Sequence, residues 1–163
     1  MKFGALLAVV LISALASCAP STTLKSTFNA SDAAFVQSKG TATINGQAFL
    51  RRNDGIVVYG AGSEVFLIPK TAYSDERMAF IYKGSKVSYF GGTFKNDDPM
   101  YQQYMLKTVA DGEGRFTFGN VAAGSYYITT HVIWFVQYQQ GGALMDQVTV
   151  GDGQSVQVIM SGM

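Results

Sequence analysis

The chain has 163 residues, with 12 lysines and arginines against 11 acidic residues and a formal net charge of +1. A balance this close to neutrality argues against an electrostatic footprint for nucleic acid or for anionic lipid. The single cysteine excludes an intramolecular disulfide, so the folded part must rely on its hydrophobic core. The 18 glycines, 9 tyrosines and 11 phenylalanines are typical of a β-rich protein with many tight turns.

The first 17 residues have the pattern of an export signal peptide. Lys2 supplies a positive start, and residues 3–16 contain no charged side chain. A charged start, an apolar run of about 7–15 residues and small residues at the end are typical of such signals. The run is too short to span a membrane, which takes about 20 apolar residues. We therefore expect residues 1–17 to be removed on export.

The signal ends in Leu15-Ala16-Ser17-Cys18, which contains the only cysteine. This stretch resembles the lipobox of bacterial lipoproteins. The resemblance implies that Cys18 becomes the first residue, receives three acyl chains and holds the protein at a membrane of the bacterial cell envelope. Ala19, rather than aspartate, implies the outer membrane by similarity to enteric bacteria, and leaves the periplasmic or outward side open. Ala14-x-Ala16 would also suit an ordinary signal peptidase, which leaves secretion without a lipid as an alternative.

Residues 18–39 are predicted to form a lipidated tether. They open with Ala19-Pro20-Ser21-Thr22-Thr23 and continue with mixed small and polar side chains. A flexible chain of about 20 residues has a root-mean-square reach of about 25 Å. The domain that follows, over residues 40–163, would therefore stay close to the membrane.

Turn signals break the chain at short intervals after residue 40. Examples are Asn53-Asp54-Gly55, Asp111-Gly112 and Gly141-Gly142, and the runs between such signals are rich in Val, Ile, Phe, Tyr and Thr. This spacing predicts an all-β sandwich or barrel. The expected strands lie near 41–51, 63–69, 86–91, 105–110, 115–119, 125–137, 144–150 and 154–160.

The run 126–136 is apolar on both of its faces. Alternation places one set of side chains on one face and a second set on the other: Tyr126, Ile128, Thr130, Val132 and Trp134, against Tyr127, His131, Ile133 and Phe135. Such a strand is usually central, with its second face covered as well. Either the segment 72–104 or a partner protein would supply that cover.

Segment 72–104 departs from simple alternation. Ser74 can cap a helix, Asp75 suits its first turn and Gly84 its end, which predicts a short helix near 75–83. Asp98-Pro99 can open a second, single helical turn.

Three stretches carry a resemblance to a known family: Ile44-x-Gly46 through Val65-x-Leu67, then Asp111 through Ile128 with its Gly124-x-Tyr126, then Val148 through Val158. With them, residues 40–162 resemble the carboxypeptidase regulatory-like domains, which share a transthyretin-like β-sandwich. The resemblance implies an all-β fold of about seven to eight strands with one short helix. Segment 72–104 is longer than the usual connection, so a special function would lie there. The family consists mostly of non-catalytic accessory or adhesion-like modules.

Candidate catalytic and metal-binding groups are few. His131 is the only histidine, and a metal site or a catalytic triad needs partners beyond it. The transthyretin-like fold includes one enzyme type, 5-hydroxyisourate hydrolase, but this chain lacks that family's several histidines and its Tyr-Arg-Gly-Ser ending. Turn chemistry explains the acidic clusters at 96–98 and 111–113 without a calcium ion. We expect no catalytic residue, no metal and no cofactor.

Aromatic side chains gather in the second half of the long insert: Tyr82, Tyr89, Phe90, Phe94, Tyr101 and Tyr104. Aromatic rings anchor protein interfaces and stack on sugars, but they also fill cores. The first hypothesis is a non-enzymatic, membrane-anchored lipoprotein that binds another envelope protein or acts as a structural accessory. The alternative is a module that binds peptidoglycan or a surface polysaccharide, which would need two or more exposed, roughly coplanar rings in 82–104. Nucleic acid is not an expected partner.

Overall fold

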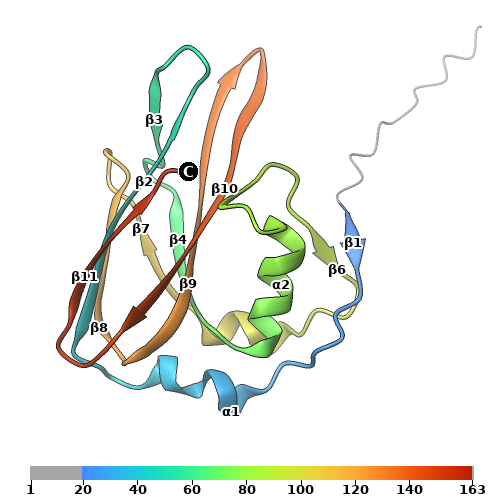
Figure 1. Ribbon diagram of the computed structural model, residues 1–163, viewed down its shortest axis with the longest axis vertical. Coiled ribbons are helices and arrows are strands. Elements are labelled where there is room, and N and C mark those ends of the chain that lie inside the picture. The colour runs from blue at the N-terminus through green and yellow to red at the C-terminus, as the bar shows by residue number, and fades with distance from the viewer. Residues whose placement is uncertain (1–19, 163) are drawn as a thin grey trace, which may run out of the picture.

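The computed structural model describes residues 20–162, and the chain is coloured along its length in Figure 1. Two predictions lie outside these residues: the signal peptide over 1–17 and the lipid on Cys18. None of the helices between residues 20 and 162 is long and apolar enough to cross a membrane.

Two open sheets pack as a β-sandwich, which confirms the predicted fold class (Figure 1). The first sheet has the strand order β5-β10-β9-β4-β7. Its strands are β4 (Glu64–Pro69), β5 (Val87–Ser88), β7 (Leu106–Val109), β9 (Gly124–Val136) and β10 (Tyr138–Val150). The second sheet is built around β2, which pairs in parallel with β11 and antiparallel with β8 and β3. Its strands are β2 (Ala42–Arg51), β3 (Val57–Tyr59), β8 (Arg115–Val121) and β11 (Ser155–Met160).

Strand β9 is central, as its two apolar faces predict. It pairs with β10 along its whole length and with β4 over Tyr126–Thr130. One face points between the sheets, where Tyr126, Ile128 and Val132 are fully buried. We call this layer the inner core; its largest aliphatic members are Ile44, Leu67, Ile128 and Leu144.

The insert covers the Tyr127 end of the other face of β9, whereas His131, Ile133 and Phe135 further along that face are exposed. Helix α2 (Ala72–Tyr82) and the 3-10 helix η2 (Pro99–Tyr104) lie on this side, opposite the four-stranded sheet (Figure 1). Thr71 caps α2, and Ser74, the predicted cap, completes a reciprocal capping box three residues later. Side chains of this layer form a second cluster, here called the outer cluster: Leu24, Ile68, Tyr73, Met78, Tyr82, Tyr101 and Tyr127.

Residues 20–39 belong to the folded domain, so the prediction of a flexible tether is wrong for them. β1 (Ser21–Thr22) pairs in parallel with β6 (Thr93–Phe94), and α1 (Ala30–Ala33) continues into the 3-10 helix η1 (Ala34–Gln37). Leu24, Ala33 and Val36 are buried. Leu24 stands alone between exposed residues, whereas Ala33 and Val36 belong to the short apolar run 33–36, in which Phe35 also packs against the core.

The β9–β10 hairpin is longer than predicted, because Gly141-Gly142 is not a turn. The chain reverses at Gln137, which has a φ of 64°. The two glycines lie within β10, where a Cβ at Gly141 would come 2.0 Å from the Val132 carbonyl oxygen. A Cβ at Gly142 would lie 2.7 Å from the carbonyl oxygen of Ser88. The absence of a side chain at these two glycines lets the backbone of β10 lie close to the backbones of β9 and β5, which is a known role of glycine within strands. The predicted strand over 86–91 is correspondingly limited to Val87–Ser88.

Candidate functional site

An open groove of about 650 Å³ lies on the outer face of the five-stranded sheet. Its volume is in the range of about 300–1,000 Å³ that ligand sites occupy. One wall is α2, another is the segment 91–105, and strands β4, β7, β9 and β10 form the floor. We call it the outer groove. Its apolar lining includes Phe66, Ile68, Met78, Ile81, Met105 and Ala143, and its polar side chains are Arg77, Gln102, Lys107, Thr129 and His131.

Strand register gathers the floor of the outer groove on one face. Phe66 of β4 stands between Lys107 of β7 and Thr129 of β9. Two positions further along β9, His131 is paired with Ala143 of β10. Every second residue of a strand lies on the same face, and paired residues of neighbouring strands share a face. These side chains therefore project together toward α2.

Small residues keep the outer groove from being filled. Gly91 and Gly92 have no side chain, and Ala143 offers only a methyl group. Gly92 also lies close to α2, since a Cβ there would come 2.8 Å from the Phe80 ring. A larger residue at these positions would close the space between the loop, the helix and the sheet.

Arg77 fixes the wall made by residues 93–104. Its guanidinium carbon lies 4.2 Å from the ring centroid of Phe94 and 4.5 Å from that of Tyr101. It also forms a salt bridge with Asp97. Stacking between rings and pairing with a carboxylate together hold this segment against α2.

Two buried polar atoms beside this wall lack hydrogen-bond partners among the described residues: Nε of Arg77 and the hydroxyl of Tyr101. Burial raises the pKa of Tyr101, so its hydroxyl ionises at a higher pH than that of an exposed tyrosine. A buried polar group without a hydrogen-bond partner costs about 1–3 kcal/mol of stability.

Tyrosine hydroxyls tie the outer cluster to the backbone and to α2. Tyr82 donates to the carbonyl of Leu144 at 3.2 Å, and burial raises its pKa as well. The hydroxyl of Tyr127 donates to Asp75 at 2.7 Å and accepts from the ammonium of Lys70 at 2.9 Å. These bonds anchor both ends of the helix that forms one wall of the outer groove.

The charged groups of the outer groove are compensated outside it. Lys107 pairs with Glu64 at 2.8 Å, and Arg77 pairs with Asp97. Neither carboxylate belongs to the lining. His131 is exposed in the groove. Within residues 20–162, no group of three His, Cys, Asp or Glu side chains is placed to hold a metal ion.

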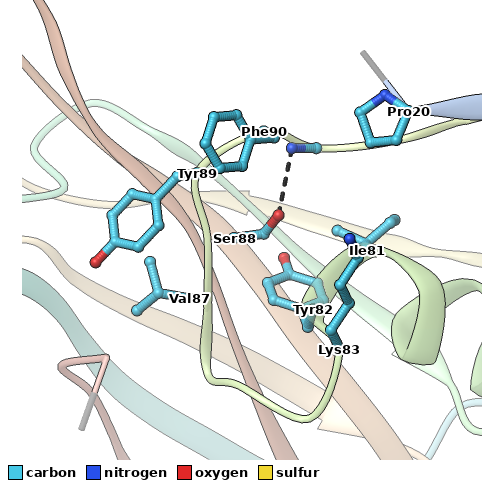
Figure 2. A pocket seen from close by; sticks show the side chains of 9 residues that line it. Pro20, Ile81, Tyr82, Lys83, Val87, Ser88, Tyr89 and Phe90 are labelled. Carbon is cyan, nitrogen blue, oxygen red and sulfur yellow. Dashed lines mark hydrogen bonds between the residues drawn. The ribbon is translucent and has the colours of Figure 1, made fainter.

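The six aromatic residues that the sequence singled out do not form one surface. Tyr82 and Tyr101 are buried, at 4% and 2% exposure, and Phe94 and Tyr104 are half-buried. Tyr89 and Phe90 are exposed, at 67% and 81%. Figure 2 shows their rings pointing in different directions from the 88–91 loop, so they provide no shared flat platform.

Sequence reasoning missed most of the polar lining of the outer groove. No motif in the sequence points to Gln102, Lys107 or Thr129, and His131 is considered from the sequence only as a metal ligand or a member of a catalytic triad. Thr129 and His131 share the alternating face of β9 whose cover was correctly questioned, and that alternation was the available signal. Gln102 and Lys107 had no such signal, because the path of the chain after α2 brings them there.

Comparisons with known proteins give a fold and a first functional clue. No protein family and no curated protein matches this chain. A crystal structure of a Pseudomonas aeruginosa protein, to which carbohydrate binding is provisionally ascribed, is similar with a TM-score of 0.68 and 27% identity. The match covers 82% of this chain and 97% of the other. It supports the β-rich fold, while membership of the carboxypeptidase regulatory-like family stays a prediction.

Proposed function

We propose that this protein is a non-enzymatic carbohydrate-binding β-sandwich and that the outer groove is its binding site. The observation that carries the proposal is the composition of this groove, an apolar floor bordered by hydrogen-bonding side chains. The likeness to the Pseudomonas aeruginosa protein supports the same reading. Of the two hypotheses drawn from the sequence, this favours the alternative, although only Tyr82 and Tyr101 of the six aromatics line the groove.

The apolar floor suits the C–H face of a sugar ring. Phe66, Ile81, Met105 and Ala143 line the outer groove and are half-buried, so each keeps surface available to a ligand. A ligand that covers this surface gains the hydrophobic contribution of about 25 cal/mol per Å² of apolar area removed from water.

The polar border suits the hydroxyl groups of a sugar. Gln102 offers two donors and an acceptor, Thr129 offers a hydroxyl, and Lys107 adds donors at one end. The described lining contains no carboxylate. Glycoside hydrolysis generally uses two carboxyl groups across the scissile bond, so this lining supports binding rather than cleavage.

The place of action is proposed from the sequence. A lipid on Cys18 would hold the domain at a membrane of the bacterial envelope, with the outer membrane favoured by Ala19. Peptidoglycan and surface polysaccharides are the carbohydrates present there, and they are the ligand classes to test first.

The test is binding of the purified chain to a glycan array that includes peptidoglycan fragments and bacterial surface polysaccharides, followed by calorimetry. Loss of one or two hydrogen bonds in Gln102→Ala or His131→Ala is expected to weaken binding about tenfold. Gln157→Ala, on the exposed face of β11, is the matched control and should bind like wild type. Absence of binding to every glycan, or equal binding by the three variants, would contradict the proposal.

A protein-binding accessory role remains a second candidate, supported by the outer face of β9 beyond the groove. Ile133 and Phe135 are 42% and 76% exposed there. Crosslinking in intact membranes of chains that carry a photoreactive residue at position 135 tests this role. A single specific adduct would support it, and the absence of any adduct would argue against it.

A further inference from the structure

The described chain begins beside a loop with two exposed aromatic residues, Tyr89 and Phe90. Pro20 lines a small pocket of about 210 Å³ together with Tyr89 and Phe90 (Figure 2). Its position is fixed, because the Pro20 carbonyl accepts from the Thr93 amide at 2.9 Å and the next residues form β1. The point at which the chain leaves the domain is therefore held next to this loop.

Cys18 precedes Pro20 by two residues, so their Cα atoms are at most about 7 Å apart. A free tether of about 20 residues would instead have left the domain about 25 Å of reach. If Cys18 carries the predicted lipid, the bilayer surface must lie next to the Pro20 end of the domain. The folded state of residues 20–39 is what converts a loose attachment into a close one.

The side chains around this exit point suit a membrane interface. Phe90 is 81% exposed and Tyr89 is 67% exposed, and neither ring is among the packed aromatic pairs of the fold. A tyrosine ring is favourable at the boundary between lipid headgroups and acyl chains, where its apolar part is buried and its hydroxyl reaches water. A phenylalanine ring, which has no hydroxyl, is favourable on the apolar side of that boundary.

Two lysines flank the same end of the domain. Lys83 lines the small pocket, and the Lys95 amide donates to Thr22 at 2.9 Å. Neither ammonium has a carboxylate within salt-bridge distance among residues 20–162. Although the whole chain is nearly neutral, these two ammonium groups are available to anionic lipid headgroups, which attract positive charge.

We propose that the 89–90 loop, with Lys83 and Lys95, is a lipid-contacting surface that docks the anchored domain against its membrane in one orientation. This proposal rests on the predicted lipid at Cys18 and is independent of carbohydrate binding. Ile81, Tyr82 and Gly91 line both the small pocket and the outer groove, so the groove would lie next to the docked surface.

The test uses the full chain, processed and purified from membranes and reconstituted in vesicles of phosphatidylethanolamine and phosphatidylglycerol. A nitroxide label is placed at Phe90→Cys, with Tyr89→Cys as a second position, since both side chains are exposed enough for labelling without unfolding. Ile159→Cys is the matched control, because Ile159 is 55% exposed on β11 of the opposite sheet. Paramagnetic resonance then compares the accessibility of each label to oxygen and to a water-soluble nickel complex.

We expect the labels at 89 and 90 to lie about 5–10 Å into the boundary between headgroups and acyl chains, and the label at 159 to remain in water. Labels at 89 and 90 that are as accessible to nickel as the label at 159 would overturn the proposal. The same result would follow if this loop docked a protein instead of a membrane, so that outcome also overturns it. The unsubstituted chain should take up no label, because a lipidated Cys18 has no free thiol. Stoichiometric labelling of that chain would overturn the anchor, and with it the docking, without bearing on glycan binding.

Discussion

The two faces of the five-stranded sheet are packed in different ways. The inner core lies between two sheets and is mainly aliphatic, with Ile44, Leu67, Ile128 and Leu144 fully buried. The outer cluster lies under one helix and an irregular segment, and much of its buried volume comes from four tyrosines. The hydroxyls of Tyr73, Tyr82 and Tyr127 bond to the backbone or to carboxylates, whereas that of Tyr101 has no partner among the described residues. The inner layer is closed, whereas the outer layer leaves a groove. The difference suggests that stability comes mainly from the first layer and binding from the second.

The largest expected effect is in the inner core. Ile128→Ala should lower the free energy of unfolding by about 2–5 kcal/mol, because it removes a fully buried side chain and leaves a cavity. Ile81→Ala, at the half-buried edge of the outer groove, should cost only about 1 kcal/mol. Urea denaturation of both variants measures the contrast. Equal losses would show that the two layers contribute alike.

The N-terminal segment extends the comparison, because Leu24 belongs to the outer cluster. Leu24→Ala should lower the free energy of unfolding by about 2 kcal/mol, because the side chain is only 4% exposed. This is the lower end of the range for such truncations. Thr23→Ala, at an exposed neighbouring position, should change stability by less than about 0.5 kcal/mol. If Leu24→Ala and Thr23→Ala have the same free energy of unfolding, residues 20–39 do not pack on the domain, and the prediction of a flexible tether would hold.

Arg77 tests how the wall of the outer groove is held. Arg77→Met should cost about 1–2 kcal/mol, less than a fully buried pair, because the partner Asp97 is 42% exposed. Hydrogen exchange should rise in residues 93–104 and stay unchanged in β2. Arg77→Lys keeps the charge but loses the planar stacking, so it should fall between wild type and Arg77→Met. Unchanged exchange in 93–104 would remove Arg77 from this role.

Alkaline pH acts on buried tyrosines of both layers. Burial raises the pKa of Tyr126 in the inner core to about 12, and it also raises those of Tyr82 and Tyr101 in the outer cluster. The unfolded chain ionises near pH 10 while the fold keeps these protons, so stability is full below about pH 10 and falls as the pH rises toward the folded pKa.

Each tyrosine that stays protonated lowers the free energy of unfolding by about 1.4 kcal/mol per pH unit above pH 10. Denaturation curves at several pH values, with tyrosinate absorbance recorded in parallel, measure this loss. Tyr82→Phe removes one titrating group and should make the slope shallower. A stability that stays flat between pH 10 and pH 12 would contradict the burial of these hydroxyls.

The sequence was most informative where one sheet faces another. In the predicted strands 115–119, 144–150 and 154–160, alternation of apolar and polar residues predicts that Phe116, Phe118, Val148 and Val158 point inward, and all four are buried. The faces of such strands can be predicted from sequence, because the pleat of a strand makes successive side chains point to opposite sides of the sheet. The two-sided run in β9 also predicted that something must cover its second face.

The same reasoning failed where contacts depend on the path of the chain. Tyr82 and Phe90 have similar side chains in the same segment, yet one is buried under the helix and the other is exposed. Their difference follows from the end of α2 at Lys83, which has left-handed backbone geometry. Leu24 is buried because β1 pairs with β6 about 70 residues away, and no local pattern carries that information.

The most direct test of the central claim is an amide chemical-shift titration with soluble peptidoglycan oligosaccharides and with purified surface polysaccharide fragments. The account predicts that at least one of these ligands shifts amides around Gln102, Lys107, Thr129 and His131, on the outer face, and leaves those of β11 in place. Shifts confined to the four-stranded sheet, or none with either ligand at saturating concentration, would contradict a carbohydrate site in the outer groove.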